Sequence, residues 1–277
     1  MRRVLVATFV ILTAVLVAPR ADAQTVLPAD DRFVLGLRTG FQHFSYTEKI
    51  GAIESSYDSV GPALGLSAHF RILDRLRLNL DLLGTFIQEN TETWKNLGTV
   101  AGLPISQQNE MDVNFAVFDI DASYSFLKTS RFDWALALGW HYYQENFTRS
   151  NFRFLVATIV IPVNILPVSE DVTGQGIKFG TTLRFMATDK LSLQGGFAYY
   201  SLYDVQADNS RLGKVGSDGD AFRWRVALDY FVARNFTLET GYEGHFINVS
   251  QGRSARAILP RNETRAHTFL VGLGIRF

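Results

Sequence analysis

Two pairs of side chains in this sequence have the types and spacing that acid–base chemistry needs. Asp119 and Asp121 are two residues apart, so on a β-strand both carboxylates point to one face. Glu243 and His245 share that spacing, and a carboxylate beside an imidazole can act as a general acid–base pair. His141 could complete a set of three and predict a metal site. The alternative is a structural role, because carboxylates lie beside histidines in many proteins without catalysis.

The sequence offers no evident nucleophile beside these groups. His245 is followed by Phe246-Ile247-Asn248, so the histidine-x-serine arrangement of a deacylase is missing. Ser250 is the next hydroxyl, and it has no evident partner. What these residues do therefore depends on the elements that position them.

Those elements alternate between apolar and polar residues with a period of two. Between residues 132 and 142, Phe132, Trp134, Leu136, Leu138, Trp140 and Tyr142 oppose Asp133, Ala135, Ala137, Gly139 and His141. Helical spacing fits these segments less well. An apolar face opposite a small or polar face is typical of strands with lipid outside and a polar interior. We predict strands within residues 33–42, 60–70, 76–86, 118–126, 132–142, 177–185, 191–199, 222–230, 236–246 and 267–277.

The connections between these strands alternate between short and long. The short ones are predicted at residues 72–75, 127–131, 187–190 and 232–235, and the long ones at 45–58, 88–111, 145–175, 201–219 and 248–265. Short periplasmic turns and long external loops are typical of membrane barrels. A soluble β-sandwich would alternate too, but without this rhythm. We predict an all-β protein, a closed up-and-down antiparallel transmembrane barrel of about ten strands with both termini in the periplasm.

Ionisable residues lie on the polar faces of the predicted strands, where opposite charges should pair because an unpaired buried ion is costly. This predicts either a structural network that fills the lumen or the lining of a narrow charged pore. The residues are Arg38, Arg77, Asp81, Asp119, Asp121, Lys178, Arg184, Arg223, Arg225, Asp229, Glu239, Glu243 and His245.

The catalytic alternative is a surface hydrolase, either a protease or a lipid A-modifying enzyme, with its site at the outer rim. Asp119 and Asp121 resemble the paired aspartates of omptin-type proteases. By strand direction, however, we expect these aspartates at mid-depth or lower and Glu243 with His245 near the outer rim. We therefore expect no shared catalytic site, and we predict a protein that is not an enzyme and needs no metal or other cofactor.

The N-terminus predicts export. Arg2 and Arg3 precede an apolar run, and Ala21-Asp22-Ala23 provides small residues before a cleavage site at Gln24. This run, at about fifteen residues, is shorter than the roughly 20 that span a membrane as a helix. We predict a signal peptide over residues 1–23, one barrel domain over 24–277, and the cell outer membrane as the location.

Composition narrows the partners. Without the charged residues of the signal peptide, 24 basic and 26 acidic residues remain of 27 and 27, a net charge of −2. This balance does not favour nucleic-acid binding. The absence of cysteine excludes disulfides and thiolate metal sites. We expect outer-membrane lipids and lipopolysaccharide as partners, while the oligomeric state is not predicted. The loop at 145–175 is unusually apolar, and we interpret it as extended strands, a segment folded over the lumen, or a contact surface for lipid or another chain.

Several short stretches resemble Legionella-type major outer-membrane proteins. They are Phe118-Asp119-Ile120-Asp121-Ala122-Ser123-Tyr124, the strands at 134–142 and 191–200, Gly241-Tyr242-Glu243, and the ending Leu273-Gly274-Ile275-Arg276-Phe277. The resemblance implies a pore-forming or surface-exposed envelope protein, and it transfers no catalytic residue. The last strand also resembles that of other bacterial outer-membrane barrels, whose final Phe is read by the barrel assembly machinery. This implies that Phe277 contacts that machinery.

Overall fold

The structure is a computed structural model that describes residues 32–86, 88–254 and 258–277. The expected signal peptide lies outside these residues. Within them the regular secondary structure is β-strand, and none of the described residues forms a helix long and apolar enough to span a membrane. The strands are β1 Phe33–Ile50, β2 Ile53–Leu73, β3 Leu76–Thr85, β4 Gln88–Lys95, β5 Thr99–Val100, β6 Leu103–Lys128, β7 Phe132–Val156, β8 Ile159–Pro162, β9 Val168–Thr188, β10 Leu191–Asn209, β11 Gly213–Ala233, β12 Phe236–Val249, β13 Gly252–Arg253, β14 Ile258–Leu259 and β15 Arg261–Arg276.

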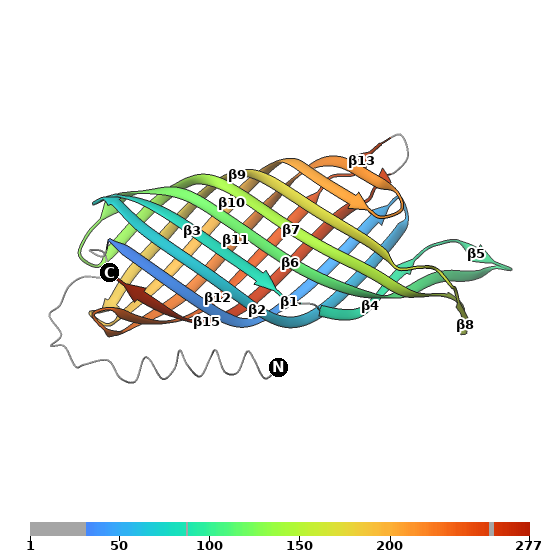
Figure 1. Cartoon of the computed structure of the whole chain (residues 1–277), viewed down its shortest axis with the longest axis horizontal. Coiled ribbons are helices and arrows are strands. Elements are labelled where there is room, and N and C mark those ends of the chain that lie inside the picture. Colours follow the sequence, from blue (N-terminus) through green and yellow to red (C-terminus); the bar gives the residue numbers. More distant parts are fainter. Residues whose placement is uncertain (1–31, 87, 255–257) are drawn as a thin grey trace.

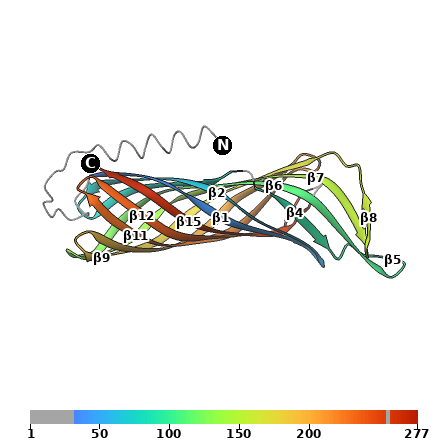
Figure 2. The ribbon, with the colours of Figure 1, turned by 90° about the horizontal axis from the view of Figure 1, so that it is seen from below.

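The long strands close into an antiparallel barrel (Figures 1 and 2). β3 and β4 both pair with β2 on one side and β6 on the other. They lie end to end and together occupy one strand position of the wall. In the described chain, ten strand positions follow around the ring: β1, β2, β3 with β4, β6, β7, β9, β10, β11, β12 and β15. β15 pairs with β1 from Val34↔Arg276 to Lys49↔Arg261, which closes the sheet. The predicted all-β antiparallel barrel of about ten strands is confirmed.

The predicted short turns are confirmed, whereas the predicted long loops are mostly strand. β1 and β2 continue past residue 45 to a turn at Gly51, and β4 lies inside the expected loop at 88–111. The loop at 145–175 consists largely of the ends of β7 and β9 with β8 between them. Of the three interpretations of this loop, extended strands is therefore the correct one. The prediction stopped too early because the outward residues become polar there, while hydrogen-bonded pairing continues between the strands.

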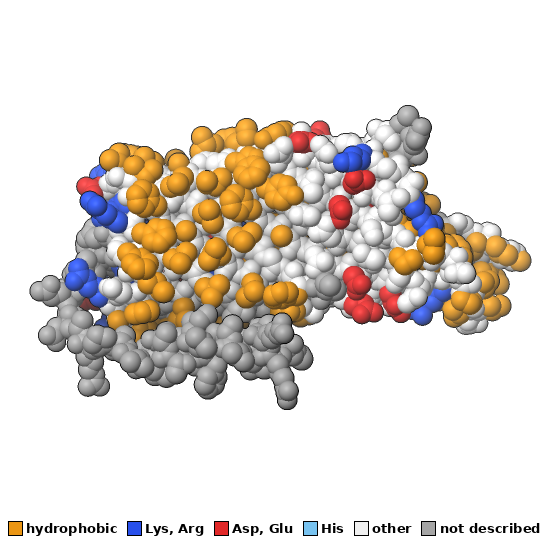
Figure 3. Space-filling model, in the orientation of Figure 1, with side chains coloured by type: hydrophobic (Ala, Val, Ile, Leu, Met, Phe, Trp, Pro, Cys, Tyr) orange, Lys and Arg blue, Asp and Glu red, His pale blue; other side chains and the backbone are white. Residues whose placement is uncertain are grey.

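Apolar side chains cover the outer wall on the side of the short turns. Figure 3 shows this belt, followed by a band with little apolar surface and scattered acidic and basic side chains. Phe41, Leu136, Leu138 and Phe179 are each more than half exposed in the belt. Burial alternates along the strands as the sequence predicts, because successive residues point to opposite faces.

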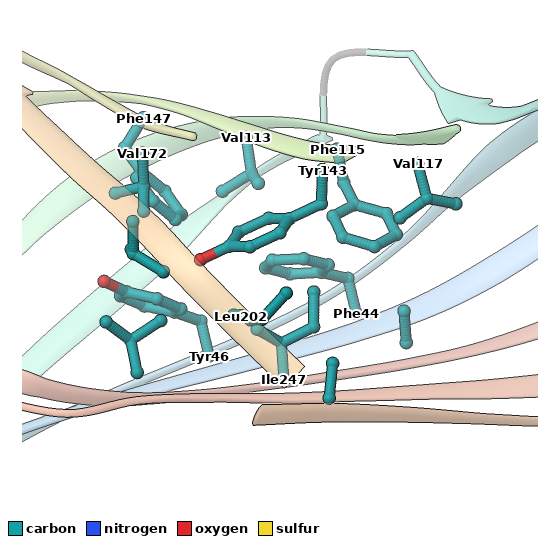
Figure 4. Packing of buried hydrophobic residues seen from close by; sticks show 14 of the residues in the cluster. Phe44, Tyr46, Val113, Phe115, Val117, Tyr143, Phe147, Val172, Leu202 and Ile247 are labelled. Atoms are coloured by element: carbon teal, nitrogen blue, oxygen red, sulfur yellow. The ribbon is translucent and has the colours of Figure 1, made fainter. Parts of the chain in front are cut away.

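A second apolar layer lies inside the barrel. Phe44, Phe115 and Tyr143 meet across the interior, with the Phe44 and Phe115 ring centroids 5.8 Å apart (Figure 4). We call this cluster the apolar plug, and each strand position supplies a member that is at most 2% exposed. These members are Phe44, Ala63, Leu83, Phe115, Tyr143, Val172, Leu202, Ala221, Ile247 and Ala266. The plug was not predicted from the sequence, although Tyr143 and Phe147 continue the inward positions of β7.

Candidate functional site

The candidate site is a network of charged side chains on the inner wall, between the short turns and the apolar plug. Every predicted lumen residue lies on a strand of the ring, in a position that alternates with the exposed belt. β1 contributes Arg38, β3 contributes Arg77 and Asp81, β6 contributes Asp119 and Asp121, β9 contributes Lys178 and Arg184, β11 contributes Arg223, Arg225 and Asp229, and β12 contributes Glu239, Glu243 and His245.

Arg223 joins the network across the barrel. Its guanidinium lies 2.9 Å from Asp81, 3.3 Å from Asp119 and 2.6 Å from Glu243. Arg38 reinforces the same carboxylates, at 2.7 Å from Asp81 and 3.8 Å from Glu243. A planar guanidinium suits several carboxylates at once because its N–H donors spread in a fixed fork. One arginine thus connects β3, β6 and β12.

Asp119 is surrounded by donors. Lys178 Nζ lies 3.1 Å away, the Tyr200 hydroxyl donates at 3.0 Å, and His141 Nδ1 lies 2.6 Å from the other carboxylate oxygen. The Tyr200 and His141 rings pack at a centroid distance of 4.0 Å. Lys178 also binds Asp121 at 2.7 Å. These contacts hold the Asp119 carboxylate in one orientation and leave it 2% exposed.

A cavity of about 220 Å³ lies beside this network, toward the short turns. Arg77 pairs with Asp133 at 2.8 Å, and Arg225 pairs with Glu239 at 2.5 Å. Arg184 lies 3.8 Å from Asp229, a longer contact, and is the more exposed partner. Charges on this side are therefore paired but more open than those around Arg223.

The expected separation of Asp119 and Asp121 from Glu243 and His245 is wrong. Glu243 and Asp119 share Arg223, so Glu243 lies at the same depth as Asp119 rather than at the outer rim. Strands in a barrel are tilted and staggered, so distance from a turn along one strand does not give depth relative to another strand. His245 Nε2 lies 3.4 Å from Glu243, whereas His141 contacts Asp119 instead of joining that pair.

A second charged cluster, which the sequence analysis missed, lies on the far side of the plug. Arg149 is bound by Glu48 at 2.9 Å, Glu92 at 2.8 Å and Glu170 at 2.8 Å. Burial alone would lower the pKa of Arg149, but these carboxylates raise it well above its ordinary value. Its residues fell in predicted loops. The inward spacing of Tyr143, Glu145, Phe147 and Arg149 was the signal that could have revealed it.

Glu145 lies between the plug and the Arg149 cluster and is fully buried. Burial raises its pKa to about 8; the Thr264 hydroxyl opposes the rise, and Glu170 and Glu48 add to it. Burial also raises the pKa of Glu48 to about 7, against the opposing effect of Arg149. Glu145 therefore holds a proton at neutral pH, whereas Arg149 helps to lower the pKa of Glu92 in the same cluster.

The chemistry of the central network is that of compensated buried charge. Both imidazoles are at most 3% exposed, and their carboxylate partners are bound by arginine or lysine. Among the described residues, no group of three or more histidine, aspartate or glutamate side chains is arranged to hold a metal ion. The arrangement supports cross-linking of the wall by ion pairs.

Comparison with known proteins identifies the fold. No family model and no curated protein matches the chain. The outer membrane protease OmpT from Escherichia coli matches with a TM-score of 0.70 and 10% identity, over 92% of this chain and 100% of that chain. The transport unit of the E. coli autotransporter AIDA-I matches with a TM-score of 0.45 and 11% identity, over 91% of this chain and 93% of that chain. At 10% identity, the likeness to OmpT shows that the two chains share the barrel fold.

Proposed function

We propose that this chain is an integral outer-membrane β-barrel protein with a closed lumen and a structural or surface role. The exposed apolar belt supports membrane insertion, because soluble monomers rarely expose such large apolar patches. The fold of OmpT, an outer membrane protein, supports the location. The termini and short turns would face the periplasm, with Phe277 available to the assembly machinery and the belt in contact with lipid and lipopolysaccharide. The resemblance to Legionella-type major outer-membrane proteins is consistent with an envelope role.

The apolar plug carries the proposal of a closed lumen. A continuous aqueous channel would expose the side chains that line it at every depth. Phe44, Leu83, Tyr143 and Val172 are each 0% exposed, although they come from different sides of the ring. A barrel of about ten strands is narrow enough for side chains to fill. The charge network therefore supports a structural role over the lining of a pore.

The same plug argues against a hydrolase acting from the outer rim. It lies between the long hairpins and the two carboxylate–imidazole pairs, so a substrate from outside would have to displace it. Arg223 also occupies the carboxylates of both pairs. Protease and lipid A hydrolysis assays on the wild-type protein and on Glu243→Gln and His245→Ala variants test this alternative, and cleavage lost in both variants would support it.

Single-channel recording in planar bilayers tests the closed lumen. We expect no discrete current steps from the refolded wild-type protein. The triple variant Phe44→Ala, Phe115→Ala and Tyr143→Ala should produce steps, because it removes the aromatic rings from the plug. Phe41→Ala is the matched control, since Phe41 lies on the same strand but is 66% exposed on the outer wall. Steps from the wild-type protein would overturn the closed lumen. A triple variant that stays silent once inserted would overturn the assignment of the closure to the plug.

A further inference from the structure

Two hairpins project beyond the barrel wall at the end opposite the short turns. β5 and β6 are joined at Ala101-Gly102, and β7 and β8 are joined at Ala157-Thr158. β6 and β7 pair as far as Ile105↔Val156, so both hairpins belong to one sheet. Figures 1 and 2 show this projection, which we call the apolar arm, extending past the rest of the molecule.

The apolar arm is made of two uncharged segments. Residues 96–109 and 154–169 contain no Asp, Glu, Lys, Arg or His. Figure 3 shows an apolar patch at this end, separated from the belt by the band that carries charged side chains. The large apolar side chains exposed on the arm are Val100, Leu103, Ile159, Val160, Ile161 and Leu166. Exposed apolar patches of this kind mark interaction sites.

Both faces of the arm are apolar. Successive residues of a strand point to opposite faces, so Ile159 and Ile161 lie on one face of β8 and Val160 on the other. Their exposed fractions are 61%, 46% and 55%. One flat protein surface would cover a single face and leave the other in water. A fluid apolar phase would surround both, so this geometry favours lipid.

The edges of the arm are poorly suited to strand addition by another chain. β5 has two residues, and β8 has four and ends at Pro162. Pro104 lies opposite Thr99 in the β5–β6 hairpin. Proline removes a backbone donor, and very short edge strands offer few hydrogen bonds, so both features oppose edge-to-edge pairing. A second copy of the chain would therefore form few backbone hydrogen bonds with these edges.

We propose that the apolar arm inserts into an uncharged lipid surface other than the bilayer that holds the barrel. Along β7, residues 142 to 156 span roughly 45 Å at about 3.3 Å per residue, which carries the tip away from the belt. The inference rests on the proposed function in one respect: the barrel must lie in a bilayer, so that the arm points away from it. Its ligand is the hydrocarbon region of an apposed membrane.

Fluorescence at a single cysteine tests the insertion. The chain has no cysteine, so Val160→Cys provides one site for an environment-sensitive dye such as nitrobenzoxadiazole. With the protein in nanodiscs, addition of phosphatidylcholine vesicles should shift the emission of this dye to the blue. Ile258→Cys is the matched control, because Ile258 is 45% exposed on β14 but lies outside the arm. An unchanged spectrum at position 160 would overturn the proposal.

Vesicle flotation provides the second measurement. Ile159→Asp with Ile161→Asp should weaken capture of the nanodiscs by phosphatidylcholine vesicles at least about tenfold, because each buried apolar side chain contributes about a tenfold effect or more. Ile258→Asp should leave capture unchanged. Self-association of nanodiscs without vesicles, lost in the double variant, would assign the arm to a second copy and overturn lipid insertion. Failure of the barrel to enter nanodiscs would contradict the proposed function instead.

Discussion

Arg223 is the residue on which the central network depends. Replacing it with Met leaves Asp81, Asp119 and Glu243 without the cation that joins them. Removing one partner of a buried ion pair costs about 3–5 kcal/mol, because the remaining charge stays desolvated. We expect Arg223→Met to lower the free energy of unfolding by about that amount, measured by urea titration of tryptophan fluorescence in detergent micelles.

Arg265→Met is the matched control for Arg223. Arg265 pairs with Glu263 at 3.3 Å, but its side chain is 59% exposed, and exposed pairs contribute at most about 1 kcal/mol. A loss of equal size in both variants would show that the network contributes no more than a surface ion pair.

Glu145 makes stability depend on pH. Its pKa of about 8 in the folded chain exceeds its ordinary value of 4.5, so the folded chain holds a proton that the unfolded chain releases. The stability that this group contributes is therefore fully present below pH 4.5, and it is lost as the pH rises through about 8. One pKa unit corresponds to about 1.4 kcal/mol, so we expect a loss of roughly 3–5 kcal/mol from this group.

Unfolding titrations at pH 5, 7 and 9 measure this effect. Glu145→Gln stays neutral at every pH and should lose less stability between pH 5 and 9 than the wild-type protein. A shallower slope should persist, because the pKa of Glu48 is also raised, to about 7. Parallel pH profiles for the two proteins would contradict the assignment to Glu145.

At the scale of elements, the seam between β1 and β15 requires close approach of two backbones. A Cβ added to Gly40 would lie 1.8 Å from the carbonyl oxygen of Phe269, a backbone atom that cannot rotate away. We expect Gly40→Ala to reduce the free energy of unfolding by about 1–3 kcal/mol, as overpacked sites do. Gly195→Ala meets nothing within 4 Å and should be nearly neutral in the same urea titration. Equal stability of both variants would show that the seam relaxes.

The sequence predicted the elements better than their lengths. Alternation between apolar and polar residues located the strands because lipid and interior select opposite faces, as at Trp134 and Asp133. Beyond the belt the outer face becomes polar, so this contrast disappears while the hydrogen-bonded ladder continues. β4 and the outer part of β7 were therefore predicted as loops.

The sequence also identified which charges face inward but not how they combine. Asp119 and Glu243 lie on β6 and β12, and the stagger of a closed barrel determines which residues meet across its interior. No local pattern contains that stagger. The pairing of both carboxylates with Arg223 was therefore visible only in three dimensions.

At the scale of the whole molecule, the interior consists of layers, and the outer surface changes its character along the same direction. The cavity, the Arg223 network and the plug follow from the short turns toward the long hairpins, and the Arg149 cluster follows the plug. The apolar belt surrounds the network, where water cannot compensate an unpaired charge from outside. Charged side chains inside this part of the wall must therefore pair with one another, because an unpaired charge next to hydrocarbon would be costly.

Tryptophan quenching by lipids with brominated acyl chains tests this placement. The chain has four tryptophans, so variants that keep one and replace the others with Phe report on single depths. Trp134 lies on the outer wall next to Phe126. Trp94 lies on β4 beyond the belt, on the inward face that it shares with Glu92. We expect strong quenching when only Trp134 is kept and little when only Trp94 is kept, because bromine quenches only fluorophores that it contacts. Equal quenching at both positions would contradict a membrane limited to the belt.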